Sequence, residues 1–566
     1  MSIGFMGTVV LLGYTAAHLF GHDRPAGPLH KSRSAVLARQ GMAATSQPLA
    51  TEAALAVLRA GGSAVDAAIA ANAVLGVVEP MSCGLGGDLF AIVWDAQTRR
   101  LYGLNASGAA PARATIAEFR RRGLDRIPTY GPLSWSVPGC VDGWSMLHER
   151  FGRLPWSKLF DEAIRHAEDG FPVSELIAAE WQAAAPALAE VPATAACFLP
   201  HGVAPATGDV FRNPDLAQSL RRIAQNGRDA FYSGPIAQAI ADYARQTDAL
   251  LTAEDLAGHR GEWVDPVSTH YRGYDVWELP PPCQGIAVLQ ILNLIEPYDL
   301  KALGFGSPEL VHLMVEAKKL AYEDRARYYA DPRFAEVPVA RLISKPYARQ
   351  RASELNLARA SQKPRAGDPT GSADTIYLTV ADPQGTVVSL IQSNFHGFGS
   401  HHVVPGLGFP LQNRGTLFAL DPSHANRLEP GKRPFHTIIP AFVTHQGEPW
   451  ASLGLMGGDM QAQGHAQVLV NLIDFGMDVQ EAGDAPRWRH DGSSDPTGTP
   501  ADGGGIVYLE SGFPPGLAEA LRARGHRVEA ASPGGFGGYQ AIRIDRRRGI
   551  LIGGSDPRKD GLAAGF

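Results

Sequence analysis

The sequence predicts an α+β fold in which β-sheets are covered on their outer faces by helices. Three regions of different character support this prediction: the N-terminal third alternates helix and strand patterns, residues 150–360 are mostly helical, and strands dominate after residue 374. Strands after residue 374 cannot cover their own faces. Both halves of the chain are therefore expected to build one domain.

The first elements are predicted from capping and breaking residues. A helix rich in Ala and Leu spans 51–59 and ends at a Gly-Gly pair. Ser63 caps a second helix, with Asp66 three residues further on, and Pro80 ends it. Residues 89–94 then read as a buried strand.

The rest of the chain changes from helices to strands. Within the helical region, three prolines at 280–282 interrupt the pattern, and a long amphipathic helix spans 309–329. After residue 374 two helices are expected, at 461–475 and 516–524. Strands are expected at 375–381, 386–393, 437–444, 450–455, 506–510, 539–545 and 550–553.

Composition excludes several classes of protein. Among 566 residues, 45% are hydrophobic and 19% are charged, which is typical of a globular protein with a large core. The net charge of −6, with no concentrated basic stripe, indicates no nucleic-acid partner. The four cysteines form no CxxC pair, so neither a disulfide framework nor a zinc site is expected; they are Cys83, Cys140, Cys197 and Cys283.

No motif for a cofactor or a metal is found, and none is expected to bind. The sequence lacks a P-loop, a GxSxG elbow and an HExxH helix. The glycines of GLGG (84–87) precede a strand, where a dinucleotide fingerprint needs a helix, so they indicate a tight turn with close backbone packing. His396, His401 and His402 lack a carboxylate beside them and are interpreted as hydrogen-bonded polar residues.

Residues 1–36 are interpreted as an N-terminal extension. Residues 1–20 are apolar but lack a basic n-region, and their longest apolar run is too short to span a bilayer. A secretory signal, an upstream start codon and a loosely packed extension remain alternatives. No later segment resembles a membrane span, so no membrane partner is expected. The expected location is the cytoplasm, with the periplasm as the alternative.

The junction between Asp374 and Thr375 carries the first chemical hypothesis. A polar run over 361–374 stops there, and a strand opens with a threonine. If the bond before Thr375 were cut, that residue would carry both a hydroxyl nucleophile and a free amine, which together catalyse acyl transfer. The alternative is an ordinary strand that opens with a β-favouring residue.

Two further features fit a nucleophile at that position. The hairpin partner strand ends in Ser393, whose hydroxyl can hydrogen-bond the Thr375 hydroxyl across the sheet. Gly457 and Gly458 follow a strand, where backbone N–H groups can turn toward a ligand as in an oxyanion hole. A plain strand-to-helix turn is the alternative for the two glycines.

Polar residues near two other strand ends are candidates for substrate binding. Asn413 and Arg414 are expected at the end of a strand over 409–412, where Arg414 can meet a substrate carboxylate. A surface arginine is the alternative. His436 and Thr437 place polar side chains at the mouth of the strand over 437–444.

Ten short motifs then identify a resemblance to the γ-glutamyltransferase (glutathione hydrolase) proenzymes, a family of N-terminal nucleophile hydrolases. The resemblance covers about residues 40–566, and the motifs are specific in this order and spacing: GGSAVDAA (61–68), VEP (78–80), GLGG (84–87), AP (110–111), VPG (137–139), EDR (323–325), GKRP (431–434), GG (457–458), DAPR (484–487) and GSDP (554–557). It implies a four-layer αββα sandwich that cleaves itself. The products would be a large subunit, 37–374 with the extension before it, and a small subunit, 375–566, which together form one domain.

By position, the resemblance also implies roles for individual residues. Thr375 corresponds to the nucleophile and new N-terminus, Ser393 to a threonine that hydrogen-bonds it, and Gly457 and Gly458 to the oxyanion hole. The freed α-amine, with a reference pKa of about 7.7–8.0, can accept the hydroxyl proton near neutral pH. The acyl group would pass to Thr375 and then to water or an amine.

The residues that hold glutamate in glutathione-cleaving members are replaced here. Ser107 stands where those enzymes have an arginine, and Leu417 where they have an acidic residue. Asn413-Arg414 replaces an Asn-Gln pair, and His436-Thr437 replaces a Ser-Ser pair. The pattern resembles the family's divergent branch, which includes oxamate amidohydrolase and cephalosporin acylase-like members.

Three hypotheses follow. The first is an autoprocessing amide hydrolase that acts on a small anionic amide, with Arg414 receiving an acyl group that lacks an α-amine. The second keeps γ-glutamyl transfer, with recognition rebuilt from Arg414, His436 and Thr437. The third is an unprocessed, non-catalytic binding protein. The expected partners are the small-molecule substrate, the two subunits of the precursor and, as an open alternative, a second copy of the processed unit.

Overall fold

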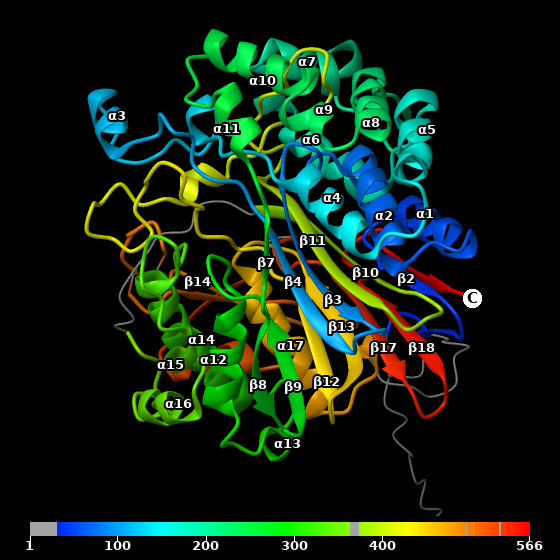
Figure 1. Cartoon of the computed structure of the whole chain (residues 1–566). Coiled ribbons are helices and arrows are strands. Elements are labelled where there is room, and N and C mark those ends of the chain that lie inside the picture. The colour runs from blue at the N-terminus through cyan, green and yellow to red at the C-terminus, as the bar shows by residue number, and fades with distance from the viewer. Residues whose placement is uncertain (1–30, 363–372, 494, 502, 531–533) are drawn as a thin grey trace, which may run out of the picture.

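The computed structural model describes residues 31–362, 373–493, 495–501, 503–530 and 534–566. Most of the N-terminal extension and most of the polar run before Thr375 lie outside the described residues. Two seven-stranded sheets lie face to face and helices cover both outer faces (Figure 1), which confirms the predicted αββα sandwich. Among the described residues, no helix combines the length and apolar character needed to cross a bilayer.

The first sheet carries Thr375 near its middle, and all its neighbouring strands are antiparallel. The strands β10 and β3 that flank β11 are, like β11, buried along almost their whole length, because both faces of this sheet are covered. In spatial order its strands are β19 (Leu562–Gly565), β2 (Met42–Thr45), β10 (Ala373–Ala381), β11 (Val387–His396), β3 (Asp88–Asp95), β4 (Arg100–Ala106) and β7 (Glu262–Val264).

The second sheet is also antiparallel and leads to the Gly457-Gly458 turn. Each of the two sheets contains strands from before and after residue 374, so neither half of the chain forms a complete sheet. In spatial order its strands are β1 (Val36–Ala38), β18 (Ile550–Ser555), β17 (Tyr539–Asp545), β13 (Glu448–Leu455), β12 (Ala441–His445), β9 (Tyr274–Glu278) and β8 (Val267–Tyr271).

Helices cover the first sheet on one side and the second sheet on the other. The helices α1 (Pro48–Arg59), α2 (Ala64–Val78) and α4 (Cys140–Phe151) pack on the first sheet, above it in Figure 1. The helices α12 (Gly285–Ile295) and α17 (Met460–Ile473) pack on the second sheet, and α14 (Pro308–Tyr328) packs on α12. The predicted capping box is present, since the Ser63 hydroxyl accepts the Asp66 N–H at 3.0 Å.

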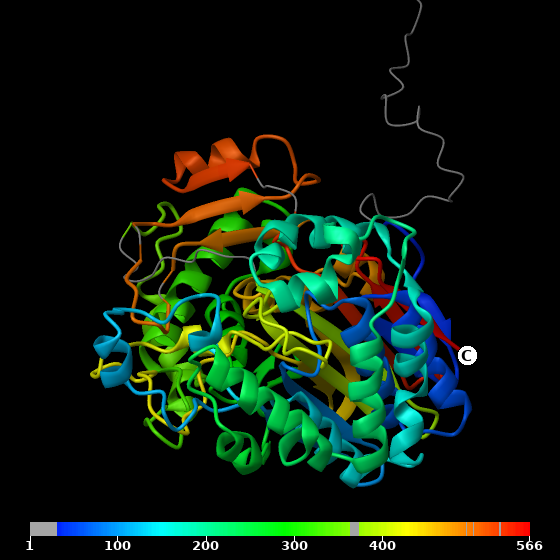
Figure 2. The same ribbon diagram turned by 90° about the horizontal axis from the view of Figure 1, so that it is seen from above.

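The remaining elements extend the two helical layers and add two small sheets, one of two strands, β5 and β6, and one of three, β14–β16. Figure 2 shows the three-stranded sheet beside the sandwich, with α19 against α14. The bounds are α3 (Ile116–Arg121), α5 (Asp161–Asp169), β5 (Phe171–Pro172), α6 (Glu175–Ala189), α7 (Pro192–Phe198), β6 (Val210–Phe211), α8 (Pro214–Asn226), α9 (Asp229–Tyr232), α10 (Pro235–Gln246), α11 (Ala253–Gly258), α13 (Leu300–Leu303), α15 (Val339–Leu342), α16 (Lys345–Ala352), α18 (Val479–Asp484), β14 (Trp488–Asp491), β15 (Ile506–Leu509), α19 (Leu517–Ala523) and β16 (Arg527–Ala530).

Two strand predictions were wrong near the site, and proline explains both. No strand forms over 409–412: Pro410 makes only an isolated bridge with Val403, and Arg414 opens a short 3-10 turn, η5 (Arg414–Leu417). The strand predicted from residue 437 starts at Ala441. Pro410 and Pro440 have no N–H to donate to a ladder, so regular pairing cannot run through them.

Candidate active site

Thr375 lies fully buried at the start of β10, beside β11. Its hydroxyl donates to the Ser393 hydroxyl at 3.1 Å, as the hairpin predicted. The β10–β11 register shifts between Asp374 and Ile376, so Thr375 sits at a bulge. Phe395, which pairs with Asp374, has φ of +82°, a region that a non-glycine residue rarely occupies. The backbone is therefore irregular on both strands at the predicted cleavage point.

Contacts between the two sheets bring the Gly457-Gly458 turn to the same end of β10. The Thr379 hydroxyl donates to Ser452 at 2.7 Å, and the Tyr377 ring packs directly on Gly454. Residues nearer the start of β10 thus contact residues nearer the end of β13. If this progression continues by one more pair of residues, Met456, which directly precedes the two glycines, lies at the level of Thr375.

The Gly457-Gly458 turn favours glycine at both positions. Their φ angles are +118° and +57°, and a Cβ on Gly457 would lie 3.1 Å from the Gly537 Cα. The Gln284 amide donates to the Gly458 carbonyl at 2.9 Å and to the Thr437 carbonyl at 2.6 Å. No acceptor for the N–H groups of Gly457 and Gly458 is found in the described part of the chain. These two donors can therefore serve a bound oxyanion.

Gln284 belongs to a buried network that fixes this turn. Its side-chain oxygen accepts from Arg325 Nη1 at 2.8 Å, and the same nitrogen donates to Asp459 Oδ1 at 2.6 Å. Asp459 directly follows the two glycines and is the N-cap of α17. The network thereby joins the helix, the glycine turn and the segment that carries Thr437.

Arg414 is buried, so the alternative of a surface arginine is wrong. Its Nη1 donates to the Thr437 hydroxyl at 2.9 Å, and its guanidinium lies 4.3 Å from the centre of the Phe395 ring. Its Nε and Nη2 have no hydrogen-bond partner among the described residues. Burial lowers the pKa of Arg414 to about 9, against the opposing attraction of Asp88.

Asp88 lies next to this arginine and was not predicted as a site residue. It pairs with Ser393 in the β3–β11 register, so the two side chains share one face of the sheet. Its Oδ1 accepts the Gly108 N–H at 2.8 Å, and its Oδ2 lies 3.5 Å from His436 Nε2. Burial raises the pKa of Asp88 to about 7, while Arg414 acts to lower it.

His436 completes this group, which we call the Arg414 cluster: Asp88, Arg414, His436 and Thr437. Its ring is fully buried and meets the Phe90 ring edge-on at 5.1 Å. Neither ring nitrogen has a hydrogen-bond partner among the residues described. Burial holds the pKa of His436 well below its usual range, so the ring is neutral.

Asn413 and Ser107, the other predicted binding residues, are already hydrogen-bonded within the protein. The Asn413 amide nitrogen contacts the Thr129 carbonyl at 2.7 Å and His396 Nδ1 at 2.8 Å. The Ser107 hydroxyl donates to Asn105 at 2.6 Å, and its carbonyl accepts from Arg433 Nε at 3.0 Å. Their role in substrate binding stays a prediction, and the contacts indicate that both residues position neighbours.

His401 and His402, interpreted from the sequence as hydrogen-bonded polar residues, each contact an aromatic side chain. His401 stacks on Tyr130, and His402 Nδ1 lies 3.0 Å from the Tyr243 hydroxyl. A separate group of His312, Glu316 and His526 has metal-like spacing, but Lys319 already pairs with Glu316 at 2.7 Å.

Residues that the sequence reasoning missed left weak signals. Asp88 is an acid at the first position of an otherwise apolar run, directly after GLGG. That contrast could have marked it, because a charge is rarely buried without a role or a partner. Gln284 and Arg325 could not be connected, since they are far apart in sequence from each other and from Gly458.

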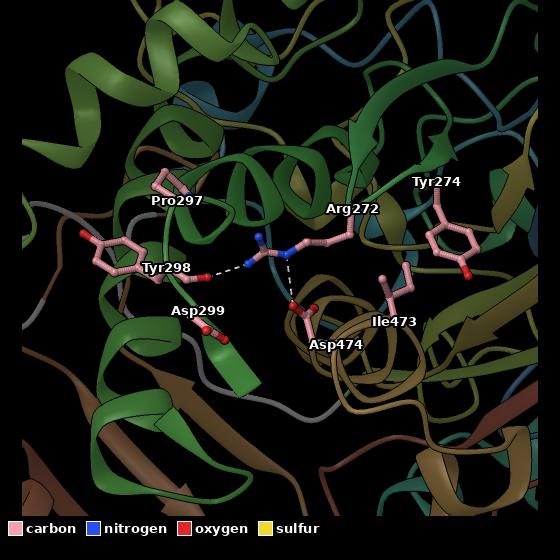
Figure 3. Close-up of a pocket in the computed structure, with 7 residues that line it drawn as sticks. All are labelled: Arg272, Tyr274, Pro297, Tyr298, Asp299, Ile473 and Asp474. Carbon is pink, nitrogen blue, oxygen red and sulfur yellow. Dashed lines mark hydrogen bonds and ion pairs between the residues drawn. The ribbon is translucent and has the colours of Figure 1, made fainter. Parts of the chain in front are cut away.

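A surface pocket lies elsewhere and contains none of the predicted site residues. Figure 3 shows Arg272 at its centre, with its Nε donating to Asp474 at 3.0 Å and its Nη2 to the Tyr298 carbonyl. The arginine here is satisfied by the protein itself, in contrast to Arg414.

Comparisons with known proteins agree with this arrangement. A family model described as gamma-glutamyltranspeptidase matches residues 50–566. The glutathione hydrolase-like YwrD proenzyme of Bacillus subtilis is 38% identical over 534 residues, 94% of this chain and 99% of that protein. The oxamate amidohydrolase proenzyme of Klebsiella pneumoniae is 36% identical over 546 residues, 94% of this chain and 100% of that protein.

A solved structure shows the same likeness in three dimensions. The crystal structure of the cephalosporin acylase from Bacillus halodurans has a TM-score of 0.87 at 41% identity, covering 97% of this chain and 99% of that chain. Both the sequence and the fold of this chain match the family along nearly the whole sequence. The chain belongs to the γ-glutamyltranspeptidase family, and it is an N-terminal nucleophile hydrolase of that family.

Proposed function

We propose that this protein cleaves itself between Asp374 and Thr375 and then uses Thr375 to hydrolyse or transfer the acyl group of a small anionic amide. The observation that carries the proposal is the buried hydrogen bond from the Thr375 hydroxyl to Ser393. The contacts between the two sheets, which lead from β10 toward the Gly457-Gly458 turn, support it. A hydroxyl, an orienting partner and free N–H donors are the parts that acyl transfer requires.

Each step can be assigned to these groups. The free α-amine of Thr375 takes the proton from its own hydroxyl, and the oxygen attacks the amide carbon. The N–H groups of Gly457 and Gly458 stabilise the negative oxygen of the tetrahedral intermediate. The C–N bond breaks and the amine leaves with the proton. Water or an acceptor amine then attacks the ester, and the α-amine again accepts the proton.

The preference for an anionic acyl group rests on Arg414. Its Nε and Nη2 form one edge of the guanidinium, the edge that binds a carboxylate through two parallel hydrogen bonds. Ser107 and Leu417 occupy the positions where the family's glutamate-holding arginine and acid would stand. A glutamyl α-carboxylate and α-amine would therefore lack their usual partners.

The second hypothesis, γ-glutamyl transfer with recognition rebuilt on Arg414, His436 and Thr437, gains support from relatives named glutathione hydrolase. Relatives named oxamate amidohydrolase and acylase support the first. These relatives differ in the substrates that their names give although each aligns over most of its length, which is consistent with a substrate choice made by a few residues near Thr375.

Steady-state kinetics with two substrates separates these hypotheses. We expect processed protein to hydrolyse oxamate with a measurable KM and to turn over γ-glutamyl-p-nitroanilide poorly and without saturation. Saturable γ-glutamyl turnover at low substrate concentration, with none of oxamate or related anionic amides, would replace the first hypothesis with the second.

A further inference from the structure

Buried polar atoms without partners converge in the Arg414 cluster. They are Oδ2 of Asp88, Nε and Nη2 of Arg414, and both ring nitrogens of His436. All three side chains are fully buried. Buried polar atoms in folded proteins are nearly always hydrogen-bonded, so a concentration of exceptions marks a place for a ligand. Because Asp88 shares a sheet face with Ser393, this place lies beside the Thr375 hydroxyl.

The charges in this place are balanced before a substrate binds. Arg414 and Asp88 attract each other without forming a direct ion pair in the described structure. Arg433 also acts on Asp88, but its Nη1 is paired with Glu262. His436 is neutral, and burial keeps the nearby Cys140 thiol neutral too. The freed α-amine of Thr375 is uncharged when it acts as a base.

A substrate carboxylate on Arg414 would upset this balance. Two anions, the substrate and Asp88, would then face a single unpaired cation in a site closed to water. Like charges that close cannot both stay ionised without a large cost, and one of them takes up a proton instead. Asp88 is the group that can do so, because burial disfavours its charged form and its Oδ2 has no hydrogen-bond partner in the described structure, although the Gln412 side chain acts to lower its pKa.

We propose that Asp88 is a specificity-determining residue that takes up a proton when an anionic acyl group binds to Arg414 and then donates a hydrogen bond to that group's carboxylate. This inference rests on the proposed function and names its substrate class more narrowly. The proton uptake is specific to an acyl group that carries one carboxylate and no ammonium. An ammonium group would pair with ionised Asp88 instead, and no proton would be taken up.

The ordinary titration of Asp88 supports the direction of this effect. Burial raises its pKa to about 7 in the empty site, and a second anion acts to raise it further. Binding of an anion should therefore take up protons near neutral pH. Above pH 7 the Asp88 proton must be gained from the solvent, so kcat/KM for an anionic amide should fall tenfold for each added pH unit.

The test compares wild-type protein with Asp88→Asn across pH 6–9, with oxamate as substrate. Asn keeps an oxygen for the Gly108 N–H and places an uncharged NH₂ at the position of Oδ2. The matched control is Asp95→Asn at the other end of the same strand. Intact mass first shows that each variant is processed. We expect the ratio of kcat/KM, Asp88→Asn over wild type, to rise about tenfold per pH unit above 7, and the control ratio to stay flat.

A direct proton measurement keeps the two proposals separable. Calorimetry of pyruvate, the methyl ketone analogue of oxamate, is done in two buffers of different ionisation enthalpy at pH 7.5. Proton uptake in wild type that vanishes in Asp88→Asn supports the inference. Binding without proton uptake, or loss of oxamate turnover in Asp88→Asn at every pH, overturns it while leaving the proposed function intact. Failure of wild type to bind pyruvate or hydrolyse oxamate would instead reject the proposed function, and the inference with it.

Discussion

Arg414 is the residue whose environment most restricts what the protein can bind. It is fully buried, one nitrogen is held by Thr437, and the edge formed by Nε and Nη2 is unpaired among the described residues. A buried cation with two free donors is costly unless a ligand supplies an anion. This cost favours an anionic group over an apolar one in the proposed binding site.

Replacing Arg414 by Gln should raise KM for oxamate. Hydrogen bonds to a charged group are worth about 1.5–3 kcal/mol, so we expect a rise of roughly ten- to hundredfold. The conservative variant Arg414→Lys keeps the charge but loses the paired donors. Its KM for oxamate should lie between the values for wild type and Arg414→Gln. Both variants should still be cleaved at residue 374, as intact mass would show. An unchanged KM in Arg414→Gln would place the carboxylate elsewhere.

At this scale the sequence predicted the hydrogen bond between Thr375 and Ser393, because neighbouring positions in a hairpin face each other. It could not predict that Arg414 is buried, since the proposed strand over 409–412 does not exist. Asp88 was missed for a similar reason. Its importance comes from pairing with Ser393, and that pairing joins segments about 300 residues apart.

At the scale of elements, the tight GLGG turn holds β11 in position. A Cβ on Gly87 would lie 2.4 Å from the Ser393 carbonyl oxygen and 2.4 Å from the Gln392 amide nitrogen. The close backbone packing predicted for this turn is therefore present. It fixes the end of β11, where Ser393 meets Thr375.

Gly87→Ala should displace this end of β11. Overpacking costs about 1–3 kcal/mol, so we expect a lower Tm and, because Ser393 moves, slower self-cleavage. Gly258→Ala is the matched control, since its Cβ would meet nothing within 4 Å. The fraction of cleaved chain over time, measured on denaturing gels, distinguishes them. Wild-type cleavage rates in Gly87→Ala would show that the Thr375–Ser393 geometry does not govern processing.

Elements with a strong local pattern were predicted well, and those ended by long-range contacts were not. The strand expected at 539–545 is β17 with the same bounds, and the Ser63 capping box is present. The strand expected from residue 437 begins four residues later, after Pro440. Local sequence patterns predict which helices and strands form, while hydrogen bonds to neighbouring strands decide where a strand begins.

At the scale of the whole molecule, buried acids make stability depend on pH. Glu79 is fully buried at the end of α2, and burial raises its pKa to about 7, although Lys559 acts to lower it. The folded state therefore binds this proton more tightly than the unfolded state does. Its contribution to stability is present at low pH and is lost as the pH rises toward about 7.

Glu79→Gln removes this titration while keeping the size of the side chain. We expect its Tm, relative to wild type, to increase between pH 5 and pH 8, measured by thermal unfolding. Glu52→Gln, an exposed position on α1, serves as the control and should show no such trend. A Tm difference that stays constant over this range would mean that Glu79 is ionised throughout.

The assembly of the two sheets was beyond sequence reasoning. The sequence patterns predicted helices outside the sheets, and the resemblance implied the αββα order. The strand order could not be predicted, because β10 pairs with both β11 and β2, and β2 lies more than 300 residues earlier in the sequence. That order has a consequence for processing: each sheet draws on both halves of the chain, so cleavage at residue 374 leaves the two products interleaved.

Intact-mass analysis of purified protein, with sequencing of the new N-terminus, tests the central claim most directly. We expect the 60.3 kDa wild-type chain to yield two fragments, the smaller beginning at Thr375, and Thr375→Ala to remain a single inactive chain. A wild-type chain that stays whole after prolonged incubation, a cut at another bond, or a cleaved and active Thr375→Ala protein would contradict the assignment of Thr375 as the nucleophile.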